Sequence, residues 1–312
     1  MRSFLVIAIC WFGLTPLLGQ TNGGAMSFPV DPIAYNPAFT GILERPVFQL
    51  QHFGRWSGLE GAPTAQEIGF HTPLPDERVA IGFRGHFNRM GVSQQWTLQA
   101  NYAYRIQLNE KWRVHFGLSA STMAHRVLYT KLEALHAVDG SLPMVNQSDY
   151  QTNFGAGIVV RQPNWYVGVS NPGLIQRRRS NYNAAAFTDF QNEGQSVYYA
   201  VAGGQIQLCP QTQLVFSGVL GTGDDWRGRF QSSWIFKDVF WVSAAYHSPD
   251  VLDVGFGVQV SNQLRLSLSN LFTFSAVQQF SSHTYGIGLR YVFSNSFPSG
   301  ETFSFSSQQF LY

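Results

Sequence analysis

The sequence predicts an all-β protein, an outer-membrane antiparallel up-and-down β-barrel of about 14 strands (12–16) after a cleaved signal peptide. Three observations favour this fold class. Apolar and polar residues alternate along segments long enough to cross a bilayer. Charged residues make up 12% of the chain while aromatic residues reach 15%, and no segment after the N-terminus is apolar enough for a membrane helix. The N-terminus has the features of a secretion signal.

Residues 94–106 show the alternation most clearly. One face of an extended chain would carry Trp96, Leu98, Ala100, Tyr102, Tyr104 and Ile106, and the other Gln95, Thr97, Gln99, Asn101, Ala103 and Arg105. A tilted strand needs about 9–11 residues to span the hydrocarbon core. Because lipid tolerates no open sheet edge, strands of this kind must close into a barrel, with lipid outside and a polar lumen inside.

We expect four parts along the chain. A signal peptide covers residues 1–19, with Arg2 before an apolar stretch that is short and broken by Gly13 and Pro16, unlike a membrane anchor. A periplasmic or plug-like lead follows at 20–46, the barrel at 47–293 and a tail at 294–312. Fifteen segments qualify as strands: 47–53, 64–71, 79–87, 94–106, 112–122, 125–132, 150–161, 164–170, 196–208, 212–220, 227–236, 239–247, 252–260, 263–270 and 283–293.

Single-chain bacterial barrels have even strand numbers, so one weak candidate, 64–71 or 125–132, should belong to a loop or to a neighbouring strand. Longer loops are expected at 133–149 and 171–195. Glycines fall on the polar faces, as in Gly286 and Gly288 between Tyr285, Ile287 and Leu289, which suits a crowded lumen. A soluble β-sandwich shows the same alternation. The signal peptide, the low charge and strands of nine or more residues weigh against it.

The sequence contains no recognisable cluster of catalytic or metal-binding residues. The eight histidines form no His-Glu-x-x-His pair, Cys209 is alone once Cys10 leaves with the signal, and no Gly-x-Ser-x-Gly turn occurs. We therefore expect no enzyme activity, no metal and no cofactor. A formal net charge of +2 gives no reason to expect nucleic-acid binding. The run 177–179 of three arginines is expected to be a solvated loop, with contact to an acidic partner as the alternative.

A more specific signal lies before and within the first hairpin. Residues 35–41 read Tyr-Asn-Pro-Ala-Phe-Thr-Gly, and 55–58 and 61–64 read Arg-Trp-Ser-Gly and Gly-Ala-Pro-Thr. Together with 154–157, 165–172 and 282–291, these pieces resemble the PorP/SprF family of type IX secretion system membrane proteins of Bacteroidetes, over about residues 28–293. The chain departs from that family by joining Arg55 directly to Trp56 and by continuing past the last strand.

The resemblance implies a non-enzymatic outer-membrane component of the type IX secretion and gliding motility machinery. Its partners would be outer-membrane lipid, periplasmic or lipoprotein subunits of the machine, and cargo with a C-terminal secretion signal. The family-motif residues, acting structurally or in partner contact, are Asn36, Pro37, Gly41, Arg55, Trp56, Gly61 and Pro63. The physical reading is a turn at 36–41, where Pro37 keeps Asn36 extended and Gly41 can take a positive φ. A porin-like or small-ligand uptake channel and an outer-membrane enzyme remain as alternatives.

Overall fold

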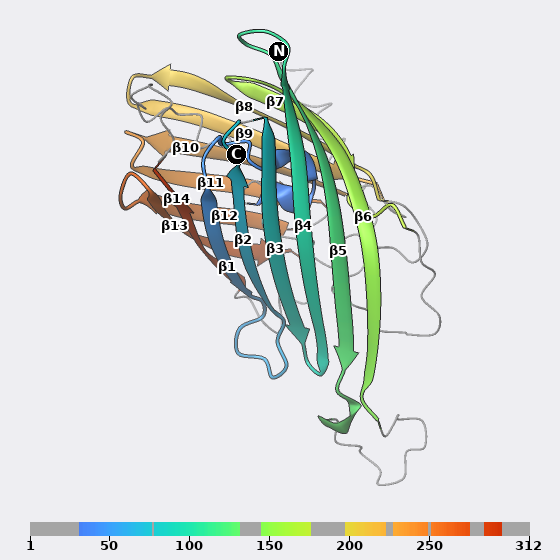
Figure 1. The fold of residues 1–312 in the computed structure, drawn as a ribbon. Helices are drawn as coiled ribbons and strands as arrows, with labels where there is room; N and C mark the ends of the chain where they lie inside the picture. Colours follow the sequence, from blue (N-terminus) through green and yellow to red (C-terminus); the bar gives the residue numbers. More distant parts are fainter. Residues whose placement is uncertain are drawn as a thin grey trace, which may run out of the picture.

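The computed structural model describes residues 31–76, 78–131, 145–175, 197–222, 227–248, 251–274 and 284–294. They form a closed, antiparallel barrel of 14 strands, as the alternation predicted (Figure 1). The strands are β1 (Val47–Gly54), β2 (Thr64–Pro73), β3 (Val79–Met90), β4 (Ser93–Gln107), β5 (Arg113–Val127), β6 (Gln147–Gln162), β7 (Trp165–Asn171), β8 (Tyr199–Cys209), β9 (Thr212–Gly221), β10 (Arg227–Phe236), β11 (Phe240–His247), β12 (Val251–Gln259), β13 (Leu264–Thr273) and β14 (Thr284–Val292).

The barrel closes because the first strand pairs with the last. Every strand lies beside its sequence neighbours, and β1 completes the circle by pairing antiparallel with β14, from Val47 opposite Val292 to Gly54 opposite Tyr285. Closure leaves no unpaired sheet edge, which a lipid environment requires. β4, β5 and β6 are the longest strands, with 15, 15 and 16 residues, and they extend beyond their neighbours at the lower end of the barrel in Figure 1.

The surplus fifteenth candidate is explained by one long strand. β5 runs without interruption through Val127, so the segments expected at 112–122 and 125–132 are one element, which is followed by a 3₁₀ turn, η3 (Tyr129–Lys131). The segment at 64–71 is β2, paired with both β1 and β3. The alternation pattern divided 112–122 from 125–132 because small and polar residues weaken it near position 123. The backbone hydrogen bonds between β5 and β4 nevertheless continue there.

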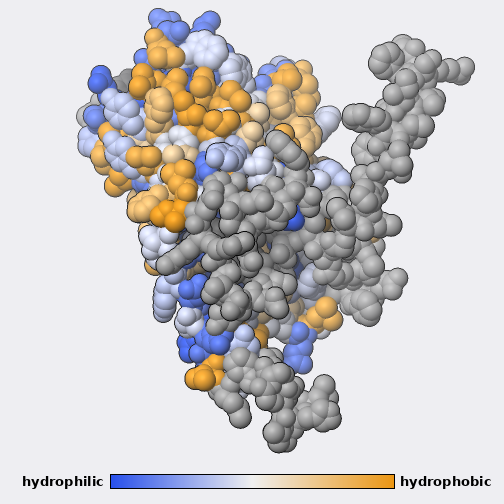
Figure 2. All heavy atoms as spheres, turned by 90° about the vertical axis from the view of Figure 1, so that its right-hand side faces the viewer, coloured by the Kyte–Doolittle hydropathy of each residue, from blue (hydrophilic) through white to orange (hydrophobic). Residues whose placement is uncertain are grey.

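The apolar faces point outward. The exposed large side chains include Trp96, Leu98 and Tyr102 of β4, and Phe116 and Leu118 of β5, as the pattern predicted for a lipid-facing wall. Figure 2 shows hydrophobic side chains gathered over the upper part of the face it presents. Aromatic pairs link outward positions of adjacent strands, such as Phe87 with Trp96 at 4.2 Å between ring centroids.

The two ends of the barrel differ in their connections. Residues 74–78, 108–112, 163–164, 210–211, 237–239 and 260–263 join strands at one end, which we name the short-turn rim. The opposite end, the long-loop rim, is bridged by 55–63, 91–92, 128–146, 172–198, 222–226, 248–250 and 274–283. This asymmetry is typical of outer-membrane barrels, in which short turns face the periplasm and longer loops face outward.

Residues 31–46, named here the luminal segment, lie inside the barrel (Figure 1). The segment contains two 3₁₀ turns, η1 (Pro32–Ala34) and η2 (Pro37–Phe39). Its apolar side chains pack against inward-facing residues of β6–β10: Val159, Tyr166, Tyr199, Val201, Val215, Val219 and Ile235. The expectation of a polar lumen is therefore wrong on this side, because those wall positions bury the luminal segment rather than face water.

None of the helices in the described ranges has the length and apolarity needed to cross a membrane. The expected signal peptide at 1–19, the arginine run 177–179 and the tail beyond residue 294 lie outside the described residues.

Candidate functional site at the luminal segment

The Asn36–Pro37 pair sets the path of the luminal segment. A proline disfavours the helical region for the residue before it, and Asn36 is accordingly extended, with φ −142° and ψ 113°. Pro37 then occupies the first position of η2, where its missing N–H costs nothing. The Asn36 Oδ1 accepts a hydrogen bond from the Ala38 N–H at 2.9 Å and so caps the turn.

The same side chain fastens the segment to the wall. Asn36 is fully buried, and its Nδ2 donates to the carbonyl oxygens of Ile158 on β6 and Val169 on β7, each at 3.2 Å. One side-chain amide thus accepts from the backbone of the turn and donates to the backbones of two strands. Among uncharged side chains, only asparagine and the longer glutamine offer an acceptor and two donors in one planar group.

Glycines in the wall make room for the backbone of the segment. A Cβ added to Gly117 on β5 would lie 2.1 Å from the Ala38 nitrogen, and one on Gly157 of β6 would lie 2.1 Å from the Asn36 Oδ1. On β7, a Cβ on Gly168 would lie 2.7 Å from the Ile158 carbonyl oxygen. Some of the glycines expected for a crowded lumen therefore leave the space that residues 36–38 occupy. This space is named here the glycine seat.

Gly41 ends the turn for two reasons. Its φ of +69° is in the left-handed region that favours glycine, and a Cβ there would lie 2.2 Å from the Cβ of Ala80 on β3. Its N–H donates to Nδ1 of His71 on β2 at 3.2 Å. The segment is thereby fixed to β2 and β3 at one end, and to β6 and β7 through Asn36.

Aromatic contacts complete the attachment. Phe39 meets Tyr166 of β7 edge-to-face at 5.3 Å between centroids, and Tyr35 meets Tyr199 of β8 in the same manner at 5.2 Å. The Ser170 hydroxyl donates to the Tyr35 carbonyl at 2.7 Å.

At the start of the segment, two carboxyl groups share one arginine. The Arg84 Nε on β3 donates to Asp31 Oδ2 at 2.8 Å and to Glu67 Oε1 on β2 at 2.5 Å. Asp31 is buried, and burial, reinforced by the neighbouring Glu67, raises its pKa from 3.8 to about 7 although Arg84 acts in the opposite direction. At neutral pH the protonated and ionised forms of the Asp31 carboxyl are therefore both populated.

At the end of the segment, Glu44 meets three arginines. Its Oε1 lies 2.7 Å from Arg105 Nη1 on β4 and is also in ion-pair contact with Arg113 of β5 and Arg161 of β6. Glu44 has a left-handed φ of 58°, which is uncommon for a residue other than glycine. All three arginines lie close to the short-turn rim, because their strands begin or end there.

The second half of the predicted motif lies at the opposite rim. The Arg55 N–H donates to the Pro63 carbonyl at 2.9 Å, which closes the β1–β2 loop, and the Gly61 carbonyl accepts from the Gly91 N–H at 2.8 Å. Trp56 has φ 49°, and its N–H donates to Thr284 Oγ1 of β14 at 3.5 Å. The structure thus brings together Asn36, Pro37 and Gly41 in the lumen, and places Arg55, Trp56, Gly61 and Pro63 in a separate loop.

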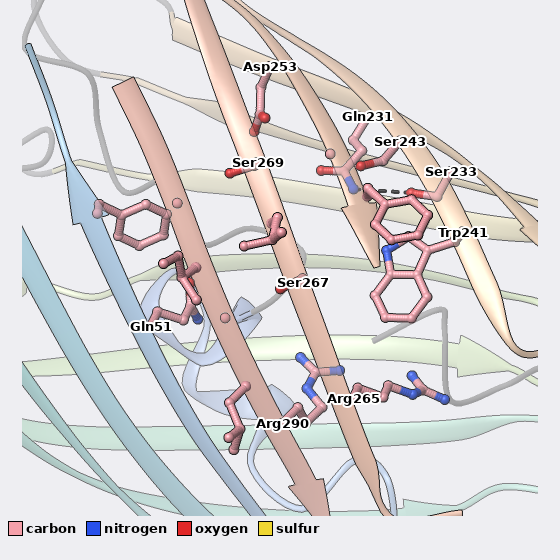
Figure 3. A pocket seen from close by; sticks show the side chains of 18 of the residues that line it. Gln51, Gln231, Ser233, Trp241, Ser243, Asp253, Arg265, Ser267, Ser269 and Arg290 are labelled. Atoms are coloured by element: carbon pink, nitrogen blue, oxygen red, sulfur yellow. Dashed lines mark hydrogen bonds between the residues drawn. The ribbon is translucent and has the colours of Figure 1, made fainter. Parts of the chain in front are cut away.

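A cavity of about 120 Å³ lies beside the inner face of the wall between β1 and β10 (Figure 3). Its wall is formed by β1 and β10–β14 and carries mostly small or polar inward residues: Gln51, Gln231, Ser233, Ser243, Asp253, Gly255, Ser267, Ser269, Gly286 and Gly288, with Trp241, Arg229, Arg265 and Arg290. The Gln231 Nε2 donates to Ser233 Oγ at 3.1 Å, and Arg229 Nη2 donates to Asp253 Oδ2 at 3.0 Å.

Within the described ranges, no group of three or more His, Cys, Asp and Glu residues is placed to hold a metal ion. His125 Nε2 lies 2.9 Å from Ser93 Oγ near the long-loop rim, a contact that the sequence did not indicate. The sequence also did not single out Asp31, Glu44, Glu67 or Arg84. Inward-facing charges at strand positions 67, 84, 105, 113 and 161 were the available signal, since a buried charge inside a barrel needs a partner.

A closed barrel with an apolar outer wall and an ordered segment in its lumen defines the protein as an integral outer-membrane β-barrel. A family model described as type IX secretion system membrane protein PorP/SprF matches residues 27–291. The chain belongs to this family, as its motifs predicted, and the protein is accordingly a type IX secretion barrel of the outer membrane.

Two solved structures resemble this chain at low identity. The monoaromatic hydrocarbon channel CymD superposes with a TM-score of 0.52 at 15% identity, covering 88% of this chain and 95% of that chain. Omp33 of Acinetobacter baumannii matches with a TM-score of 0.49 at 8% identity, covering 80% and 98% of the two chains. No curated protein matches the sequence. The similarity to CymD concerns the barrel fold alone.

Proposed function

We propose that this protein is a plugged anchor of the type IX machinery that assists export or surface attachment of cargo proteins bearing a C-terminal secretion signal. Family membership supports the connection to secretion. The observation that favours an anchor is the attachment of Asn36, whose side chain joins the luminal segment to β6 and β7. A barrel whose interior holds a fixed segment is suited to presenting rigid surfaces at its two rims rather than to free diffusion.

The proposal assigns the short-turn rim to the periplasm, following the usual asymmetry of these barrels. Periplasmic or lipoprotein subunits would then bind beside Glu44 and the neighbouring arginines, and cargo would be held near the long-loop rim. In this scheme the motif residues Asn36, Pro37, Gly41, Arg55, Trp56, Gly61 and Pro63 act structurally, by fixing the luminal segment and the β1–β2 loop.

Affinity purification tests this role. The tagged full-length protein is cross-linked in native outer membranes, extracted in mild detergent and analysed by mass spectrometry of the proteins that co-purify. We expect secretion-machine subunits or large proteins that share a C-terminal signal. The Asn36→Ala variant, purified from the same membranes, should lose part of this set, whereas Asn101→Ala, a buried lumen residue bonded to Gln99, should retain it. Recovery of the barrel alone in repeated experiments would reject the anchor role.

A small-ligand channel is the second candidate, and the cavity beside the luminal segment favours it. Planar-bilayer conductance separates the two functions. An anchor should show little conductance until the luminal segment is released, so Asn36→Ala should conduct more than the unmodified protein. A steady open conductance of the unmodified barrel, insensitive to substitutions in residues 31–46, would support the channel instead.

A further inference from the structure

Three arginines form a basic cluster at the short-turn rim, named here the arginine cup. Arg105, Arg113 and Arg161 come from the adjacent strands β4, β5 and β6, and all three contact the same oxygen of Glu44. Arg113 and Arg161 are directly opposite each other across the β5–β6 pair. Like charges in that position repel, so the arrangement depends on an anion between them.

The cup gathers positive charge around one carboxylate. It brings three guanidinium groups to Glu44, and a guanidinium is always charged in proteins. Behind the cup, His115 Nε2 accepts a hydrogen bond from Arg161 Nε at 3.2 Å, so that nitrogen carries no proton. The nearby turns carry charges of both signs: Asp76, Arg78, Glu110 and Lys111. Arg45 follows Glu44, and Arg265 and Arg290 line the lumen close to the same rim, so the cup is part of a positively charged end of the lumen.

The side chains of the cup differ in their exposed fraction. The side chains of Arg113 and Glu44 are 31% and 28% exposed, whereas that of Arg161 is 7% exposed. A carboxylate arriving from the short-turn side can therefore meet the partly exposed side chain of Arg113, which lies at the same level of the wall as Arg161. The planar donor fork of arginine matches the two oxygens of a carboxylate better than it matches a single point charge.

Glu44 reaches the cup only with an unfavourable backbone conformation. Its φ of 58° is in the left-handed region, and its N–H donates to the Gly41 carbonyl at 2.9 Å in a tight turn just before β1. A carboxylate supplied from outside would satisfy the same arginines without that conformation. Glu44 is therefore placed as a replaceable occupant, near the surface and at the end of the luminal segment.

We propose that the arginine cup is a binding site for an acidic segment of a partner protein, whose carboxylate replaces Glu44. The inference rests on the proposed anchor role for the identity of the partner as a periplasmic subunit. The binding chemistry stands on the cup itself. Binding would also release the end of the luminal segment. Binding of a partner at the rim would therefore change the attachment of the segment inside the lumen.

The test uses purified full-length barrel in detergent and a fluorescein-labelled hexaglutamate peptide, followed by fluorescence anisotropy at low salt. Glu44→Gln removes the resident carboxylate and should tighten binding by about tenfold. Arg113→Gln, added to that variant, should abolish the gain. The matched control is Arg126→Gln, which lies on the same strand at the opposite rim and should leave the affinity unchanged. Hexaglutamine and hexalysine peptides should not bind.

Equal affinities for the unmodified protein and Glu44→Gln, or equal losses from Arg113→Gln and Arg126→Gln, would overturn the proposal. Inorganic phosphate competing as strongly as the peptide at equal concentration would also overturn it, because the site would then be a general anion site. If Glu44→Gln yields no folded barrel, Arg113→Gln alone must weaken peptide binding of the unmodified protein. The assay contains no secretion subunits, so its failure leaves the co-purification test of the anchor role intact.

Discussion

Replacing Asn36 by alanine should release the luminal segment while leaving the barrel closed. The substitution removes one hydrogen bond to the Ala38 N–H and two to the carbonyls of Ile158 and Val169. Each such bond contributes about 1 kcal/mol net, so the loss amounts to about 3 kcal/mol. Every 1.4 kcal/mol is tenfold in an equilibrium, and the open form of the segment should therefore become about 100-fold more populated.

Hydrogen exchange followed by mass spectrometry measures that population directly. Peptides from residues 31–46 should exchange about 100-fold faster in Asn36→Ala, while peptides from β9 and β12 keep their rates. Asn36→Ser separates the two roles of the side chain, because a serine can still cap η2 but does not span to β6 and β7. It should show most of the alanine effect. Asn101→Ala serves as the control for loss of a buried lumen amide.

Unchanged exchange of residues 31–46 in Asn36→Ala would refute this reasoning, since the segment would then be held by its aromatic contacts alone. An equal effect of Asn101→Ala would refute it as well. Faster exchange throughout the barrel would show that Asn36 stabilises the strands rather than the segment.

Three further predictions follow from the same geometry. Gly117→Ala should displace Ala38, because the new methyl carbon would lie 2.1 Å from its nitrogen, and we expect faster exchange of residues 31–46 without strand unfolding. The raised pKa of Asp31 means that attachment of the luminal segment takes up a proton between pH 3.8 and about 7. The attachment should therefore be strongest below pH 4 and weaken by up to about 4 kcal/mol as the pH rises through 7. Exchange at pH 5 and pH 8, corrected for intrinsic rates, checks this, and Asp31→Asn should remove the difference. Leu118→Arg on the lipid face should cost about 2–4 kcal/mol in urea unfolding from lipid vesicles, unlike Ser267→Arg in the lumen.

Most of the barrel could be predicted from the sequence because lipid imposes a simple rule. Every outward position must be apolar and every strand must pair on both sides, so alternation along residues 94–106 and 284–292 identifies strands without knowledge of their neighbours. The rule fails where small residues occupy both faces, as at the junction that divided β5 into two candidates.

The interior was less predictable because its pattern depends on what fills it. Val159, Val201 and Val215 face inward and are apolar only because residues 33–42 cover them. The role of Gly41 at positive φ followed from local turn chemistry, but the glycine seat formed by Gly117 and Gly157 depends on β5 and β6 lying beside Asn36. The ion pairs of Glu44 required the same knowledge, since their partners lie from 61 to 117 positions away in the sequence.

The luminal segment and the closing seam of the barrel are mechanically continuous. Glu44 is followed within three residues by Val47, the first residue of β1, which pairs with Val292 of β14. Near the same end, the Phe293 N–H donates to the Pro46 carbonyl at 3.0 Å, and at the opposite rim Trp56 donates to Thr284 of β14. The two halves of the family motif thus flank a single strand, β1, and one hydrogen bond lies at each end of its pairing with β14, through Pro46 and through Trp56. Because β1 has only 8 residues, its position depends on these end contacts more than that of the long strands β4–β6 does. We therefore expect binding at the arginine cup to loosen the β1–β14 pairing, where the barrel closes.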